Sequence, residues 1–176
     1  EISACLVGSE MCIRDRNKAH LKLAEMEQAG KLSAIVTQNI DGLHQAAGSK
    51  NVFELHGSVH RNYCQKCGKF FDVNYVVNAK GVPYCDECGG IIKPDVVLYE
   101  EGLDSQTING AVRAISKADM LIIGGTSLVV YPAAGMIDYF KGKYLAVLNR
   151  DATSRDKQAD LCITDPIGEV LGRIRV

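Results

Sequence analysis

The sequence predicts an α/β fold in which helices cover both faces of a parallel sheet and a small metal-binding module is inserted. Three observations lead to this prediction. Short apolar runs alternate along the chain with segments of helical periodicity, which is typical of βαβ units. These runs are apolar at nearly every position, as in strands that are buried on both faces. Two Cys-x2-Cys pairs interrupt this alternation within residues 61–92.

Length and composition are those of a globular protein. The 176 residues fit one domain with a small inserted module. Apolar residues make up 47% and charged residues 23% of the chain, with a net charge of −1, which excludes intrinsic disorder for most of it. The longest apolar runs, at residues 120–123 and 128–131, are far below the roughly 18 residues of a membrane-spanning helix. We therefore expect no membrane partner and, because no basic block is present, no direct nucleic-acid partner.

Three segments are distinguished by their patterns. Residues 1–16 contain the run CLVGSEMCIRDR, which looks like translated linker sequence, and we expect this leader to be foreign to the fold. Residues 17–60 and 93–176 are predicted to form the main domain, and residues 61–92 the metal-binding module.

The first half of the main domain begins with a helix. Asn17 can cap this helix, in which apolar residues recur at three and four positions, and Gly30 can end it. A buried strand over residues 32–37 follows, then a short helix that begins near Asp41. Residues 52–55 form the next predicted strand.

After the cysteine pairs, a β-branched run predicts a strand over residues 95–99, and Pro94 suits the edge at which it starts. Asp104 is placed to cap the next helix, and Pro132 to begin another. The remaining predicted elements are three strands and a final helix, at residues 120–123, 144–148, 161–164 and 167–174.

Four of the seven cysteines have the spacing of a zinc site, Cys64-x2-Cys67-x17-Cys85-x2-Cys88. Each Cys-x2-Cys turn places two thiolates on one side of a tight knuckle, and two knuckles complete a tetrahedron. Four thiolates leave no open coordination position, so the zinc is expected to be structural. The alternative is a pair of disulfides or a redox pair. Cys162 is expected to be a small apolar residue within a strand.

Polar residues follow three of the predicted strands, at residues 37–42, 125–127 and 149–151. Ligands of parallel α/β sheets bind beyond the carboxyl ends of the strands. These three segments are therefore expected to open onto one crevice.

The motifs occur in an order that resembles the sirtuins, NAD-dependent protein-lysine deacylases. They are TQNIDGLH at residues 37–44, ELHG at 54–57, the four cysteines, and GTS at 125–127. The resemblance extends from about Asn17 to Val176. It implies that the main domain is a Rossmann-like NAD-binding domain and that the inserted module is a zinc ribbon.

The resemblance also implies roles for individual residues. His56 matches the general base, which takes a proton from a ribose hydroxyl, and Asn39 and Asp41 match the other catalytic residues, beside the nicotinamide and its ribose. The implied cofactor-binding set is Gln38, Asn39, Ile40, Asp41, His56, Gly125, Thr126, Ser127, Asn149 and Ile163. The implied substrate-binding set, along two edges that hold a peptide as an added strand, is Val97, Leu98, Tyr99, Glu100, Leu128 and Val129. For His20, His44 and His60 we expect only surface or packing roles.

The implied reaction transfers the acyl group of an acyl-lysine protein or peptide to NAD, which releases nicotinamide and O-acyl-ADP-ribose. We expect a cytoplasmic monomer. Two departures from the family pattern stand out. Tyr99-Glu100-Glu101 stands where many relatives have Phe-Gly-Glu, and no glycine-rich phosphate-binding turn precedes Asn17. We therefore expect the N-terminal part of the NAD-binding domain, including a central strand, to be missing.

Two alternative functions follow from the same sequence. The chain is then either a noncatalytic zinc-ribbon module that binds a partner, or an inactive fragment of a sirtuin.

Overall fold

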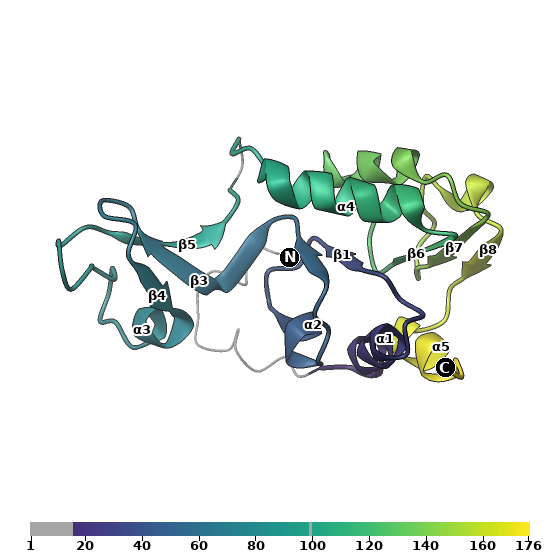
Figure 1. The fold of residues 1–176 in the computed structure, drawn as a ribbon, viewed down its shortest axis with the longest axis horizontal. Coiled ribbons are helices and arrows are strands. Elements are labelled where there is room, and N and C mark those ends of the chain that lie inside the picture. The colour runs from purple at the N-terminus through teal and green to yellow at the C-terminus, as the bar shows by residue number, and fades with distance from the viewer. Residues whose placement is uncertain (1–15, 99) are drawn as a thin grey trace.

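A computed structural model describes residues 16–98 and 100–176. Figure 1 shows a layered α/β body and, beside it, a smaller unit built around β3 (Gly57–Cys64). The predicted leader, apart from Arg16, and Tyr99 lie outside the described residues.

The parallel strands form two hydrogen-bonded groups. In the first group, β1 (Ile35–Thr37) pairs with β2 (Val52–Glu54). In the second, β7 (Tyr144–Leu148) lies between β6 (Met120–Gly124) and β8 (Leu161–Ile163). The predicted parallel pairing is confirmed, although no ladder joins the two groups within the described residues.

Helices cover the parallel strands on both sides, as predicted (Figure 1). On one side lie α4 (Ser105–Lys117) and the 3₁₀ helix η3 (Ala133–Tyr139). On the other lie α1 (Lys18–Gln28), α2 (Leu43–Ala46) and α5 (Ile167–Gly172). A short 3₁₀ turn, η4 (Asp156–Gln158), precedes β8.

The central strand β7 shows why its sequence is apolar at every position. Ala146 and Leu148 pack in one buried cluster with residues of α1 and α5. Leu145 and Val147 pack in another, with Ile137 of η3. Because successive side chains point to opposite faces of a strand, a strand covered on both faces buries neighbouring positions alike, as β7 does at Leu145, Ala146, Val147 and Leu148.

Local signals at the helix ends are confirmed. The Asn17 side chain accepts hydrogen bonds from the backbone N–H groups of Ala19 and His20 at the start of α1. The Asp104 carboxylate accepts one from the N–H of Thr107 in α4, at 2.7 Å. These bonds satisfy N–H groups that have no partner within the helix.

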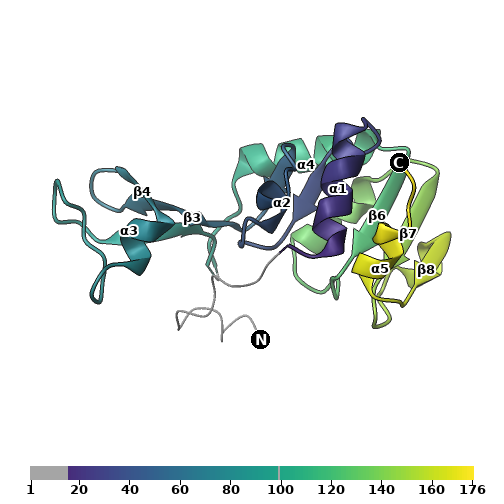
Figure 2. The same ribbon diagram turned by 90° about the horizontal axis from the view of Figure 1, so that it is seen from below.

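The smaller unit is an antiparallel sheet in which β3 lies between β4 (Phe70–Asp72) and β5 (Ile92–Val96), with α3 (Val73–Val77) packed beside it. Figure 2 shows this unit projecting from the layered body, with β3 leading into it. β3 crosses the predicted boundary at residue 61, and β5 crosses the one at residue 92. The division of the chain into a main domain and a module over residues 61–92 therefore stays a prediction.

Two predicted strand boundaries are wrong. The strand expected at 95–99 is Ile92–Val96, with Pro94 inside it. Pro94 is tolerated because β5 is the edge strand of its sheet and the ladder shifts register between Ser58 and Asn62. The strand expected from residue 32 begins at Ile35, because the N–H groups of Lys31 and Leu32 both donate to Met26 at the end of α1.

The helix predicted to begin at Pro132 is a 3₁₀ helix over Ala133–Tyr139, with Pro132 at its N-cap. The other predicted helices and strands are present to within a few residues. Among the described residues, no helix combines the length and apolar character needed to cross a membrane.

Candidate functional site

His56 lies in a turn directly after β2, where strand pairing fixes the backbone. The N–H of the buried Leu55 donates to the carbonyl oxygen of Thr37 in β1, at 2.9 Å. The His56 Nδ1 atom lies 3.1 Å from the carbonyl oxygen of Gln38, just after β1. A carbonyl oxygen only accepts, so Nδ1 carries the proton and Nε2 keeps a lone pair. The half-buried imidazole is therefore held in the tautomer of a general base.

Gln38 links this turn to the second group of parallel strands. Its side-chain Oε1 accepts a hydrogen bond from the Thr126 hydroxyl, at 3.4 Å. Thr126 follows β6, and Gly125 between them has a φ of +62°, which glycine adopts at little cost. The structure thus brings together three predicted site residues, Gln38, His56 and Thr126, at the carboxyl ends of separate strands. The neighbouring Ser127 is exposed.

The loop after β1 carries the predicted nicotinamide-side residues. The backbone N–H of Asn39, whose side chain is exposed, donates to the Thr37 hydroxyl, at 3.1 Å. The Asp41 carboxylate accepts a hydrogen bond from the N–H of Leu43, at 3.1 Å, at the start of α2. The Ile40 carbonyl accepts one from the N–H of Val59, in β3. The ligand-binding roles of these three residues stay predictions.

Asn149 and Ile163 form a separate group at the ends of β7 and β8. The N–H of Asn149 donates to the carbonyl of Ile163, and its side-chain amide donates to the carbonyl of Asp151, at 2.8 Å. The Ile163 side chain packs on the buried cluster with Ala146 and Leu148. A contact of Ile163 with a bound adenine stays a prediction.

The predicted peptide edge adjoins the His56 turn. The N–H of Val97 donates to the His56 carbonyl, at 3.1 Å, and the N–H of the half-exposed Leu98 donates to the Glu101 carboxylate, at 2.9 Å. Glu100 has a φ of +71°, which only glycine adopts without strain. Glutamate therefore occupies a position whose backbone suits the glycine of the family pattern.

The opposite predicted edge follows Thr126. Leu128 also has a positive φ, +56°, and its N–H donates to the Thr126 hydroxyl. Val129 is 71% exposed. Both edges are therefore fixed to residues of the candidate site, although peptide binding between them stays a prediction.

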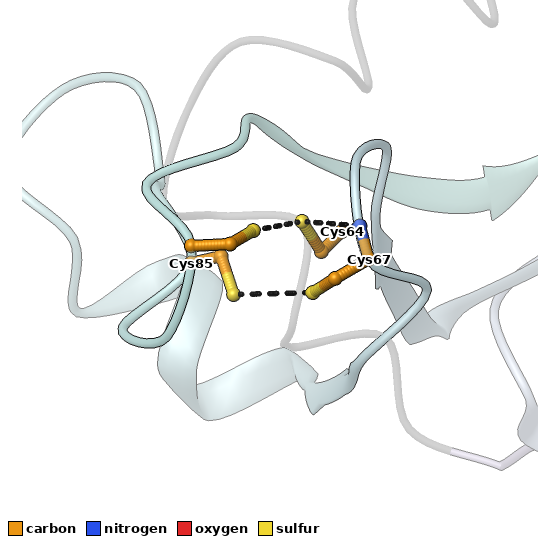
Figure 3. Close-up of side chains that lie close together, drawn as sticks. Cys64, Cys67 and Cys85 are labelled. Carbon is orange, nitrogen blue, oxygen red and sulfur yellow. Dashed lines mark hydrogen bonds between the residues drawn. The ribbon is translucent and has the colours of Figure 1, made fainter.

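The four cysteines of the module converge on one point, as their spacing predicts. Figure 3 shows the sulfur atoms of Cys64 and Cys67 directed toward the facing loop that carries Cys85. The Sγ atoms of Cys64 and Cys88 are 3.3 Å apart, those of Cys67 and Cys85 3.7 Å, and all four lie within 4.8 Å of one another. A disulfide has a bond of about 2.05 Å, whereas four sulfurs about 2.3 Å from a zinc ion lie about 3.8 Å apart. The geometry favours the zinc site over the disulfide alternative.

Backbone N–H groups stabilise the thiolate of Cys64. The N–H groups of Cys67 and Lys66 point at Cys64 Sγ, at 3.5 and 3.4 Å. These hydrogen bonds, that of Cys67 first, lower the pKa of Cys64 to about 6 against the opposing effect of burial. The N–H of Lys69 lowers the pKa of Cys67, but hydrogen bonds with the Cys88 and Cys64 thiols outweigh it and raise that pKa. The thiolate is the metal-binding form of cysteine, so within this knuckle the charged form is favoured at Cys64.

The sequence missed the role of His60, which was expected only to pack or face solvent. Its Nε2 atom lies 2.9 Å from the carbonyl oxygen of Asp41. Its ring also covers Gly42, where an added Cβ would come within 2.8 Å of His60 Cδ2. His60 therefore attaches the loop that carries Asp41 to β3. No local sequence signal could reveal this contact, because it depends on the path of β3 through the fold.

A pair of histidines lies beneath the same loop. The rings of His20 and His44 are 4.7 Å apart, and the buried His44 Nδ1 atom has no hydrogen-bond partner among the described residues. Burial, reinforced by His20, lowers the pKa of His44, while Asp41 and Glu54 oppose this shift. Burial also lowers the pKa of His20, against the opposing effect of Asp41.

This histidine pair predicts a loss of stability in mild acid. Because both folded-state pKa values lie below the reference value of about 6.5, the unfolded chain binds more protons in that window. The contribution of the two histidines to the free energy of unfolding is therefore expected to be complete above pH 6.5. It should fall as the pH drops toward the folded-state pKa values. Denaturant unfolding of the wild type and of His44→Gln, between pH 7.5 and 5.5, measures this. A variant that loses as much stability as the wild type would contradict the assignment.

Comparisons with known proteins agree with this geometry. The sequence model of the Sir2 family matches residues 9–132. The chain is 66% identical over 156 residues to an NAD-dependent protein deacetylase of Clostridium acetobutylicum, which covers 88% of this chain and 64% of that protein. It is 65% identical over 159 residues to the protein of the same name from Clostridium perfringens, covering 90% and 65% of the two chains. The chain thus spans slightly less than two thirds of these relatives.

Solved structures give the same result. A structure described as "Sir2-p53 peptide-NAD+" superposes with a TM-score of 0.87 at 36% identity, covering 98% of this chain and 74% of the other. A structure of Sir2Tm bound to a propionylated peptide superposes with a TM-score of 0.88 at 37% identity, covering 97% and 75%.

Proposed function

Because this chain belongs to the Sir2 family, we propose that the full-length protein removes acetyl or other acyl groups from protein lysine, with NAD as co-substrate. The observation that carries the proposal is the hydrogen bond from His56 Nδ1 to the Gln38 carbonyl. It leaves Nε2 available as a base where the carboxyl ends of β1, β2 and β6 come together. The names of the relatives and the NAD and peptides of the related structures support the same reaction.

The chain's own residues then have distinct roles. Bound NAD would supply the ribose carbon from which nicotinamide leaves as the acyl oxygen bonds to it, and the hydroxyl that takes the acyl group. His56 would accept the proton of that hydroxyl, so that its oxygen could bond to the acyl carbon. A water molecule would supply the remaining oxygen of O-acyl-ADP-ribose, and the lysine nitrogen would leave as the free amine. Gln38 fixes the His56 tautomer through its carbonyl and contacts Thr126 through its side chain. Asn39 and Asp41 would hold the nicotinamide and its ribose, and the hydroxyls of Thr126 and Ser127 would donate to the dinucleotide.

The acyl-lysine peptide pairs as an added strand between the edges at Val97–Glu100 and Leu128–Val129. Backbone pairing gives affinity with little dependence on the peptide sequence. The Asn149 and Ile163 group lies at the carboxyl ends of β7 and β8, where it would contact the adenosine part of the dinucleotide.

Zinc has a structural role in this proposal. The four cysteine sulfurs fill all four tetrahedral positions, so the ion has no site for water or substrate. Because cysteines that bind zinc, and do not form disulfides, are typical of reducing compartments, we place the protein in the cytoplasm. The monomeric state and the lack of nucleic-acid or membrane partners remain predictions.

The test is an assay of the purified full-length protein with an acetyl-lysine peptide. We expect nicotinamide, deacetylated peptide and O-acetyl-ADP-ribose to appear in equal amounts, and only when NAD is present. Peptide deacetylation without NAD would contradict the proposal. Binding of a protein partner without affinity for NAD would instead favour a noncatalytic zinc-ribbon module.

A further inference from the structure

Arg61, in β3, bridges two carboxylates on different strands. Its Nη1 atom lies 2.6 Å from the Glu54 carboxylate at the end of β2, and its Nε atom 2.8 Å from the Asp95 carboxylate in β5. The Glu54 side chain is only 7% exposed, whereas those of Arg61 and Asp95 are 40% and 45% exposed. Among the described residues, Arg61 is the cation paired with this nearly buried carboxylate.

The two carboxylates belong to residues on either side of the turn that carries His56. Glu54 precedes His56 by two positions, and Asp95 precedes Val97 by two. Val97 in turn donates its N–H to the His56 carbonyl. Arg61 therefore joins the strand that leads into the His56 turn to the strand that leads into the peptide edge.

The backbone around this bridge is closely packed. Gly57 pairs with Val96 and has a φ of +77°. A Cβ added at Gly57 would lie 1.9 Å from the carbonyl oxygen of Asp95. The turn and β5 thus touch directly, so a small displacement of β5 moves the backbone of His56.

We propose that Arg61 is a positioning residue for catalysis, which holds the His56 imidazole in register with the peptide edge by bridging Glu54 and Asp95. This inference rests on the proposed function. An arginine suits the role, because its planar guanidinium presents Nη1 and Nε in a fixed fork to two acceptors, whereas lysine presents a single point charge. A displacement of about 1 Å at a reacting group can cost about 100-fold in rate.

The order of the reaction provides a specific readout. Nicotinamide leaves before the acyl group passes to the ribose hydroxyl, and His56 is needed for the later transfer. Exchange of labelled nicotinamide into NAD reports the earlier step, and deacylation reports both. Displacing His56 should therefore lower deacylation more than exchange.

The experiment compares three variants of the full-length protein. Arg61→Met removes the bridge but leaves the Glu54 carboxylate buried without its cation, which is expected to lower stability. Glu54→Gln/Arg61→Met removes the bridge and the buried charge together. Lys69→Met is the matched control. Lys69 also contacts two carboxylates, those of Asp86 and Glu87, but it lies in the metal-binding module, beside the cysteines.

For both Arg61 variants we expect deacylation kcat to fall about tenfold or more, while nicotinamide exchange and the KM for NAD change by no more than about twofold. The double variant should regain stability without regaining the deacylation rate, and Lys69→Met should keep both rates. Restoration of deacylation in the double variant would overturn the proposal, because Arg61 would then only neutralise Glu54. A parallel fall of exchange and deacylation would also overturn it.

A second measurement does not depend on activity. Nitrogen NMR of the His56 ring should show the Nδ1-protonated tautomer in the wild type and a mixture of tautomers in the double variant. An unchanged ring signal would overturn the role of Arg61. If the wild-type protein did not exchange labelled nicotinamide into NAD, the proposed function would be contradicted. The NMR comparison of the wild type with the double variant would then decide whether Arg61 positions His56.

Discussion

Replacing His56 with alanine is expected to lower kcat for deacylation by about 10²–10⁴-fold, the usual contribution of a positioned general base. The physical reason is the arrangement at the end of β2, where the Nδ1–H of His56 is committed to the Gln38 carbonyl and Nε2 keeps its lone pair. Steady-state kinetics of the full-length protein, with NAD and an acetyl-lysine peptide, measure the effect. The KM for NAD is expected to change little.

Two controls separate loss of the base from loss of the fold. His56→Gln keeps an amide donor near the Gln38 carbonyl but has no basic nitrogen, so it should be as inactive as His56→Ala. His20→Ala removes another histidine, on α1, whose ring contacts His44 and the N–H of Asn17. It should remain active. Full activity of His56→Ala would refute the assignment of the general base.

The features of the fold that could be predicted are those that depend on residues close together in the sequence. Asn17 and Asp104 cap their helices through bonds to residues two or three positions away. The apolar run of β7 identified a doubly covered strand. The cysteine spacing predicted the convergence of the four sulfur atoms, because each knuckle is a local turn.

The parts that sequence reasoning missed depend on how distant segments meet. Pro94 lies inside a strand only because β5 is at the edge of its sheet, a fact of tertiary structure. His60 contacts a carbonyl 19 positions earlier in the chain, and Arg61 a carboxylate 34 positions later. These contacts depend on where β3 leaves the layered body, which no periodicity encodes. The motif at residues 37–44 could be placed at the carboxyl end of a parallel strand, but the contacts from His60 and Val59 that hold it could not be predicted.

The same path of β3 makes the zinc module important for the site. Its buried cluster consists of Cys64, Phe71, Cys85 and Ile92, so two of its four members are proposed metal ligands. A core this small cannot offset the conformational entropy of the module without an additional constraint. The metal is therefore expected to supply the constraint.

Replacing Cys85 with serine is accordingly expected to abolish zinc binding and to unfold the module that contains β3, β4 and β5. Structural zinc contributes an apparent ~10–16 kcal/mol in zinc-finger peptides, far more than this cluster of apolar side chains can replace. Atomic absorption should give a zinc content near zero. Hydrogen exchange should show lost protection in β3 and β5.

Cys162→Ser is the matched control, because Cys162 is also a free thiol but lies in β8, exposed and far along the chain from the cluster. It should keep its zinc and its exchange protection. Loss of deacylation in Cys85→Ser would be indirect, since β3 and β5 carry the contacts of Val59 with Ile40 and of Arg61 with Glu54 and Asp95 that hold the site. If a chelator removed the metal and left the hydrogen-exchange protection of β3 and β5 unchanged, the structural role of zinc would be refuted. The coupling of the module to His56 would then depend only on the antiparallel pairing of β3 with β5.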